Sequence, residues 1–241
     1  EKQAAEMETQ REQLRANLLR AISHDLRTPL TAISGNAGML MEKSVSLNEN
    51  KKQEMYRSIY DDSMWLVNLT ENLLSITRIE NGTLPLRRDA EMIGDIFHEA
   101  LSHVDRRAAE HEIRVELEDD MLMANMDARL IVQVIINIVN NAVKYTPDGG
   151  KIDMLVGTSG KNVFVRVTDN GIGIPEKDLP RLFDRFYRVD KARSRESGGT
   201  GLGLSIAQEI LNQHKGRIEI SSEYGKGTSV LIPMPAAEAQ A

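Results

Sequence analysis

A histidine followed directly by an aspartate lies in a stretch with the pattern of a packed helix. On an ideal helix His24 points about 160° away from Ile22 and the apolar seam, and Thr28 lies one turn beyond it. A neutral imidazole nitrogen is a good nucleophile near neutral pH, and Asp25 could accept the proton released on attack. Pro29 should bend or loosen the helix just beyond this point. A solvated surface histidine would also fit this stretch.

A second group of polar residues shares one face of a helix expected over 127–144. Asn137, Asn141 and Lys144 lie within about 60° of arc. The opposite face is apolar and consists of Val132, Ile135, Val139 and Ala142. Amide oxygens suit Mg²⁺ and an ammonium group suits phosphate. An amphipathic helix with an ordinary polar side would show the same pattern.

Asp169 occupies the next inward position after the alternating residues Val163, Val165 and Val167. A carboxylate that ends an apolar stripe is costly to bury without a partner, and the exocyclic amine of adenine would be one. The following Asn170-Gly171-Ile172-Gly173 forces a turn in which the backbone can approach a ligand. A plain turn fits Asn-Gly as well.

A glycine-rich stretch, Gly198-Gly199-Thr200-Gly201-Leu202-Gly203-Leu204, precedes an expected helix. Amides at a helix start bind phosphate well, although a flexible linker has a similar composition. The stretch matches neither Walker A nor G-x-G-x-x-G. Upstream, Phe183 and Phe186 are spaced to anchor a short helix. Arg185 or Arg188 could reach a γ-phosphate, and the run 191–199 could close as a lid.

The chain divides into a helical part and a mixed part. Residues 1–43 and a second helix form a hairpin; Ser46-Leu47-Asn48-Glu49 starts that second helix as a capping box, and Asn81-Gly82 ends it. The seam residues, three and four apart, are Leu19, Ile22, Leu26, Pro29, Ile33 and Leu40, then Met55, Ile59, Asp62, Leu66, Leu69, Leu73 and Ile76. One hairpin buries a single stripe on each helix, so we expect a homodimer that forms a four-helix bundle.

Helices and short strands alternate after Pro85. Helices are expected over 91–109, 127–144 and 201–214, and strands over 113–117, 122–126, 151–157, 162–169, 217–222 and 228–232. Residues 236–241 carry no fold signal. We expect a helical dimerisation hairpin over 1–84 followed by an α/β sandwich over 85–241.

The composition excludes several classes of protein. A net charge of −6 argues against a general nucleic-acid binder, and the lack of cysteine excludes disulfides and thiol catalysis. The longest apolar run, 130–143, is too short and too polar to span a bilayer, and no signal peptide is evident. The sequence starts inside a helix-like pattern, so we expect it to be part of a longer protein.

Five motifs in series resemble the catalytic core of sensor histidine kinases. Ser23-His24-Asp25-Leu26-Arg27-Thr28-Pro29 is similar to the helix of their dimerisation and phosphoacceptor (HisKA) domain. The other four are similar to the N box (137–146), the first glycine box (169–175), the F box (183–188) and the second glycine box (199–204). The resemblance covers about residues 10–235, and it is greatest to potassium-responsive, KdpD-like sensor kinases.

The resemblance implies a dimerising two-helix hairpin followed by a Bergerat-type α/β sandwich that binds Mg-ATP. His24 would accept the γ-phosphoryl group with Asp25 as base, and would pass it to an aspartate of a response regulator. Thr28 would orient a water when that regulator is dephosphorylated. The whole protein would be a membrane-anchored sensor with its catalytic portion in the cytoplasm.

The resemblance also implies roles in the ATP site. Asn141 would ligate Mg²⁺ with help from Asn137, Tyr145 would lie against the adenine, and Asp169 would read its amine. The phosphates and the rest of the nucleotide would be contacted by Lys144, Arg188, Gly171, Gly173, Gly199, Thr200, Gly201, Leu202 and Gly203.

Two other functions are open at this point. Related ATPases of the gyrase, Hsp90 and MutL group carry a glutamate one turn before the Mg²⁺ asparagine. Here that position is Asn137, which cannot act as a general base. A dimeric scaffold with a degenerate site would be favoured by the loss of His24, Asn141 or Asp169, and all three are present.

Overall fold

The structure is a computed structural model that describes residues 22–23, 26–42, 47–80, 86–104, 106–189 and 201–237. The chain divides into two compact units, Glu1–Leu74 and Ser75–Ala241. Among the described residues, no helix combines the length and the apolar character needed to cross a membrane.

The first unit contains the expected helical hairpin. Residues 26–41 are helical without a break at Pro29, and α2 (Glu49–Glu80) is the second helix. The Oδ1 atom of Asn48 accepts a hydrogen bond of 2.8 Å from the N–H of Lys51. The capping residue is thus Asn48 rather than Ser46 of the expected capping box, because the side chain directly before a helix reaches the free amides of its first turn.

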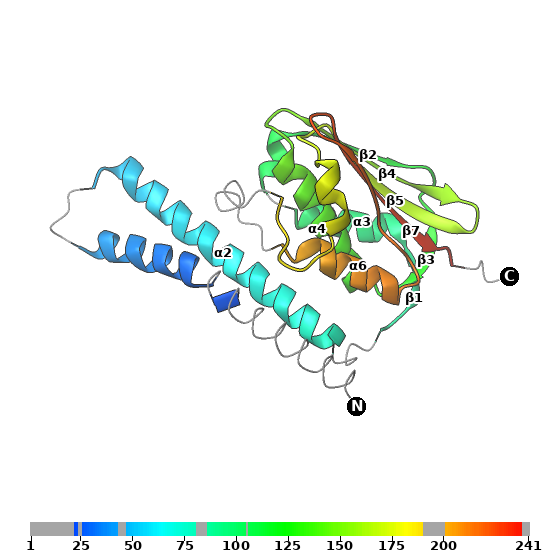
Figure 1. The fold of residues 1–241 in the computed structure, drawn as a ribbon, viewed down its shortest axis with the longest axis horizontal. Coiled ribbons are helices and arrows are strands. Elements are labelled where there is room, and N and C mark those ends of the chain that lie inside the picture. The colour runs from blue at the N-terminus through cyan, green and yellow to red at the C-terminus, as the bar shows by residue number, and fades with distance from the viewer. Residues whose placement is uncertain are drawn as a thin grey trace. The chain divides into compact units, whose positions relative to one another are not determined.

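The second unit is a two-layer α/β sandwich, in which three helices cover one face of a five-stranded sheet (Figure 1). The strand order is β2-β4-β5-β7-β6. These strands are β2 (Glu112–Leu117), β4 (Lys151–Ser159), β5 (Asn162–Asp169), β7 (Gly227–Pro235) and β6 (Glu219–Glu223). The helices are α3 (Ile93–Ser102), α4 (Ala128–Tyr145) and α6 (Gly203–Gln213). A separate antiparallel pair joins β1 (Asp89–Met92) to β3 (Met123–Met126).

The core lies between the central strand and the helix layer. Val163, Val165 and Val167 of β5 are buried, as their alternation predicts. Val134 and Val139 of α4 are buried as well, and α4 contacts α3, α6 and β5. Each such side chain stabilises the folded state by about 1.5–3 kcal/mol when it is fully buried. The helix α4 and the strand β5 are therefore firm supports for the residues at their ends.

The helix expected over 91–109 is wrong at both ends. Its first residues belong to β1, α3 stops at Ser102, and the 3₁₀ helix η1 (Arg106–Glu110) follows. Pairing with β3 overrides the local helical pattern here. The C-terminal residues also pair, contrary to expectation: Ala236 bridges Ala124, and the N–H of Ala237 donates to the carbonyl of Met123.

His214 joins the end of α6 to the start of α4. Its buried ring accepts a hydrogen bond at Nε2 from the N–H of Asp127 (2.9 Å), and its Nδ1 lies 2.7 Å from the carbonyl of Ile210. Both contacts are satisfied by a neutral ring with its proton on Nδ1. Burial lowers the pKa of His214, and the hydrogen bond to Ile210 opposes this only in part.

We expect His214→Ala to lower the free energy of unfolding by about 1–3 kcal/mol, because the buried N–H of Asp127 loses its acceptor. A lowered pKa stabilises the folded state fully above the ordinary value of about 6.5, and this stability is lost as pH falls below it. The difference between wild type and variant should therefore shrink from about pH 8 to about pH 5.5. Denaturant unfolding at both pH values measures this; equal stabilities at the higher pH would contradict it.

Candidate nucleotide and phosphoacceptor sites

The polar stripe of α4 lies at the start of α6. Asn137, Asn141 and Lys144 are partly exposed, while the residues of the opposite face are buried. The Nδ2 atom of Asn137 donates a hydrogen bond of 3.3 Å to the carbonyl of Gly203, the first residue of α6. The N-box stripe and the end of the second glycine box thus meet in the structure, as both would if they contacted one ligand.

Asp169 ends β5 with a carboxylate that two backbone amides hold. Its Oδ1 accepts hydrogen bonds from the N–H groups of Gly171 (2.9 Å) and Thr228 (3.3 Å). Burial raises the pKa of Asp169, and the two hydrogen bonds offset this only in part. Within the described part of the chain, Oδ2 has no hydrogen-bond donor. A carboxylate in this state is suited to accept from a ligand amine.

The turn after Asp169 accepts no side chain at two positions. A Cβ on Gly171 would strike the carbonyl of Tyr145, and a Cβ on Gly173, whose φ is 66°, would strike the carbonyl of Glu223. Between them, the N–H of Ile172 donates to the carbonyl of Tyr145 at 3.1 Å. The glycine turn is therefore wedged against the end of α4, which fixes the distance between Asp169 and the polar stripe.

The short helix expected at Phe183 and Phe186 is wrong. The 3₁₀ helix η2 (Glu176–Arg181) ends before it, and Phe186 has a φ of 63°. The reason is a contact distant in sequence: the N–H of Phe186 donates to the carbonyl of Gly201 at 2.9 Å. Gly201 has a φ of 69°, and a Cβ there would press on the backbone of Phe186. Residues on the two sides of the predicted lid are thus held together.

The remaining predicted nucleotide contacts differ in exposure. The ammonium of Lys144 lies 5.0 Å from the ring centre of Tyr145, a cation–π contact. Leu202 is fully buried, so its side chain belongs to the core and only its backbone lies at the loop. Arg188 is partly exposed and Arg185 is exposed. Outside the described residues lie His24, Asp25, Gly199, Thr200 and the run 191–199.

A second structural support of Asp169 was not predicted from the sequence. Besides the amide of Thr228, a serine network lies beneath the glycine turn: the Oγ of Ser222 donates to the carbonyl of Gly227 (2.9 Å) and accepts from the N–H of Ile174 (2.8 Å). A Cβ on Gly227 would strike the carbonyl of Asp169, and its φ is 127°. The run Gly225-Lys226-Gly227-Thr228 between two strand patterns was the available signal.

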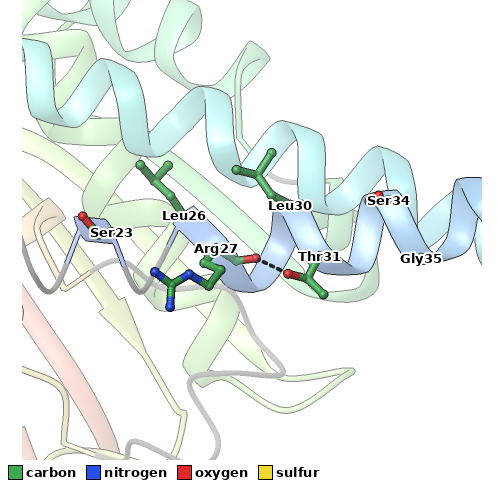
Figure 2. A pocket seen from close by; sticks show the side chains of 7 residues that line it. All are labelled: Ser23, Leu26, Arg27, Leu30, Thr31, Ser34 and Gly35. Atoms are coloured by element: carbon green, nitrogen blue, oxygen red, sulfur yellow. Dashed lines mark hydrogen bonds between the residues drawn. The ribbon is translucent and has the colours of Figure 1, made fainter.

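A hollow of about 630 Å³ lies along the first helix (Figure 2). Its described lining consists of Ser23, Leu26, Arg27, Leu30, Thr31, Ser34 and Gly35. Figure 2 shows Leu26 and Leu30 on one side of the helix and Arg27 and Thr31 on the other. Leu30 is 52% exposed, and Thr28 is exposed as well. The hollow therefore offers a mixed apolar and basic surface.

Two domain families match the chain. Residues 14–82 match the His Kinase A (phospho-acceptor) domain, and residues 126–238 match the histidine kinase-, DNA gyrase B-, and HSP90-like ATPase domain. The first match covers the hairpin with His24, and the second covers α4, the glycine turns and β7.

Two sensor proteins resemble almost the whole chain. The sensor protein KdpD of Clostridium acetobutylicum is 40% identical over 235 residues, 98% of this chain and 26% of that protein. The sensor histidine kinase WalK of Bacillus subtilis is 34% identical over 232 residues, 95% of this chain and 38% of that protein. The chain thus spans about a quarter to two fifths of these relatives.

Solved structures share the fold. The histidine kinase ThkA in complex with the response regulator protein TrrA has a TM-score of 0.70 at 23% identity, with 95% of this chain and 64% of that chain covered. The histidine kinase AdeS of Acinetobacter baumannii has a TM-score of 0.68 at 24% identity, with 89% and 98% covered. A phospho-acceptor hairpin joined to an ATPase sandwich defines a histidine kinase core. The chain belongs to the sensor histidine kinase family, and the match to KdpD agrees with the subgroup expected from the sequence.

We expect Asp169→Asn to weaken ATP binding about ten- to a hundred-fold and GTP binding much less, because a charge-assisted hydrogen bond to the adenine amine is lost. Calorimetric titration with both nucleotides measures this. Asp153→Asn is the matched control, since Asp153 is an exposed aspartate on the neighbouring strand β4. An equal loss of both nucleotides in Asp169→Asn would show that this carboxylate does not read the base.

Proposed function

We propose that this chain transfers the γ-phosphoryl group of Mg-ATP to His24 and from there to an aspartate of a response regulator, and that it also dephosphorylates that regulator. The observation that carries the proposal is the amide at position 137. Hydrolytic relatives would need a carboxylate there to activate water, whereas Asn137 is neutral and donates to the carbonyl of Gly203. With water not activated, the γ-phosphoryl group is kept for a protein acceptor.

Magnesium would be held by Asn141 with help from Asn137. Among the described residues no cluster of acidic or histidine side chains could hold a metal alone. Two neutral amides suit an ion whose other ligands are water and the phosphates of the nucleotide. Such an ion neutralises phosphate charge when it is bound. Lys144, near the end of α4, and Arg188, in the loop after η2, would add positive charge beside the phosphates.

The transfer step follows from the acceptor helix. A lone pair on a neutral ring nitrogen of His24 attacks the γ-phosphorus, the bond to the β–γ bridging oxygen breaks, and ADP leaves. Asp25 accepts the proton of the other ring nitrogen, so that a phosphohistidine with an uncharged ring results. A carboxylate of the regulator then attacks the same phosphorus and breaks its bond to nitrogen.

The regulator would dock on the first helix. Its exposed Leu30 and the basic Arg27 line the hollow together with Ser23, which directly precedes His24 in the sequence, and a receiver domain must approach His24 to receive the phosphoryl group. ThkA, which shares the fold, has been crystallised with a response regulator. The whole protein would be a membrane-anchored sensor with this portion in the cytoplasm, and its two domains would divide at about residue 84, beyond the end of α2.

His24→Gln should abolish autophosphorylation and leave ATP affinity unchanged, because the acceptor and the nucleotide site belong to different domains. Radiolabel from γ-labelled ATP and calorimetric titration measure the two properties. His103→Gln is the control, since His103 is an exposed histidine outside the acceptor helix. Wild-type labelling of His24→Gln would overturn the assignment of the acceptor.

Thr28→Ala should keep most autophosphorylation and lose most phosphatase activity, because a neutral hydroxyl can orient a water but is a poor acceptor for the imidazole proton. Asp25→Asn should instead slow the kinase step, by about 10²–10⁴-fold. Thr70→Ala, on α2, is the matched control, as its hydroxyl is bonded to the carbonyl of Val67. Parallel loss of both activities in Thr28→Ala would make Thr28 a structural residue next to Pro29.

A further inference from the structure

Polar side chains interrupt both apolar seams of the hairpin at one level. In the first helix, the spacing of three and four runs from Ile33 to Leu40 through position 36, which is an asparagine. In α2 the seam includes Asp62. The Nδ2 atom of Asn36 donates to the Oγ of Ser58 at 3.0 Å, and this Oγ donates to the Oδ2 of Asp62 at 3.5 Å. Asn36, Ser58 and Asp62 thus form a polar layer.

The polar layer is incompletely satisfied within one hairpin. In the part of the chain that the structure describes, the carboxylate of Asp62 accepts only the long hydrogen bond from Ser58. Burial raises the pKa of Asp62; the hydrogen bond from Ser58 opposes this, and the charge of Asp61 on the same helix adds to it. The facing helix carries no titratable residue between Thr28 and Met41. No charge on that stretch of the helix, all of which the structure describes, compensates the carboxylate.

The seam around the polar layer is also half covered. Seam residues on both helices remain partly exposed in the hairpin, namely Ile33, Leu40, Ile59, Leu66 and Leu73. A second copy of the chain would cover them. In a parallel dimer whose two-fold axis runs along the bundle, each residue and its copy lie at the same level. The polar layer of one copy then meets that of the other.

We propose that the polar layer is completed by the same three residues of a second copy of this chain, and that this contact selects the parallel, in-register pairing of the two hairpins. The proposal rests on the homodimer of the proposed function and deepens it. Apolar seams alone could pack in a parallel or an antiparallel direction, because the aliphatic side chains along them are similar. In the in-register pairing the Asp62 carboxyls of the two copies lie at the same level, where they can share a proton, and the second N–H of each Asn36 amide is a further donor. In an antiparallel or staggered pairing, Asp62 would face apolar side chains with no added donor, which is strongly disfavoured.

A distance between chains tests the pairing directly. The chain lacks cysteine, so a single spin label on Asn50→Cys, at the exposed start of α2, is the only label in the protein. In the parallel dimer two such labels lie at the same end. In an antiparallel dimer they lie at opposite ends of the 32-residue helix α2, a shift of roughly 40 Å at 1.5 Å per residue.

The chain that carries only Asn50→Cys should show a single short distance between labels. Adding Asp62→Leu should produce the second, longer distance as well. Asn36→Leu breaks the polar layer from the other helix and should do the same, so the test does not depend on one variant folding. Asp61→Leu, which removes an exposed charge next to the seam, is the matched control and should keep the short distance alone.

A single short distance in both Asp62→Leu and Asn36→Leu would overturn the role of the polar layer while leaving the dimer intact. A wild-type chain that sediments as a monomer would overturn the homodimer and this inference together. Labelling of His24 remains a separate measurement, so phosphoryl transfer and pairing can fail independently.

Discussion

The carboxylate of Asp169 is the group that the rest of the second unit has to accommodate. It ends the central strand, where burial disfavours its charge, and the amides of Gly171 and Thr228 hold one of its oxygens. Reaching those amides requires turns so tight that Gly173 and Gly227 can carry no side chain. The buried charge needs these backbone donors, and only glycine allows the turns that supply them. The same glycines let the turn pack against the end of α4.

Both ends of α6 are tied to α4 or its N-cap. The side chain of Asn137, in the middle of α4, donates to the carbonyl of Gly203 at the start of α6, and the N–H of Asp127, directly before α4, donates to the ring of His214, directly after α6. The N–H of Phe186, beyond η2, donates to the carbonyl of Gly201, directly before α6. The residues that flank the run 191–199 are therefore joined near the start of α6.

The sequence predicted the elements whose signal is local and missed those that depend on distant contacts. The periodicity of α4 and the alternating valines of β5 placed both elements and the stripe correctly. The four residues of β1 are a strand because β3 pairs with them, and Phe186 leaves the helical region because of Gly201. Thr228 supports Asp169 through its backbone N–H, which has no signature in residue type. The phosphoacceptor role of His24 could be predicted only from the motifs that follow it, since its own helix would suit a solvated histidine equally well.

In the function that we propose, a site built around Asp169 and α4 delivers the γ-phosphoryl group of ATP to His24. Phosphorus NMR of the intact chain after incubation with Mg-ATP, combined with tandem mass spectrometry, identifies both the bond and the residue. We expect an acid-labile, alkali-stable phosphorus–nitrogen bond on the peptide that contains His24. Release of inorganic phosphate without any protein-bound phosphorus, or a phosphoryl group bound to oxygen, would contradict it.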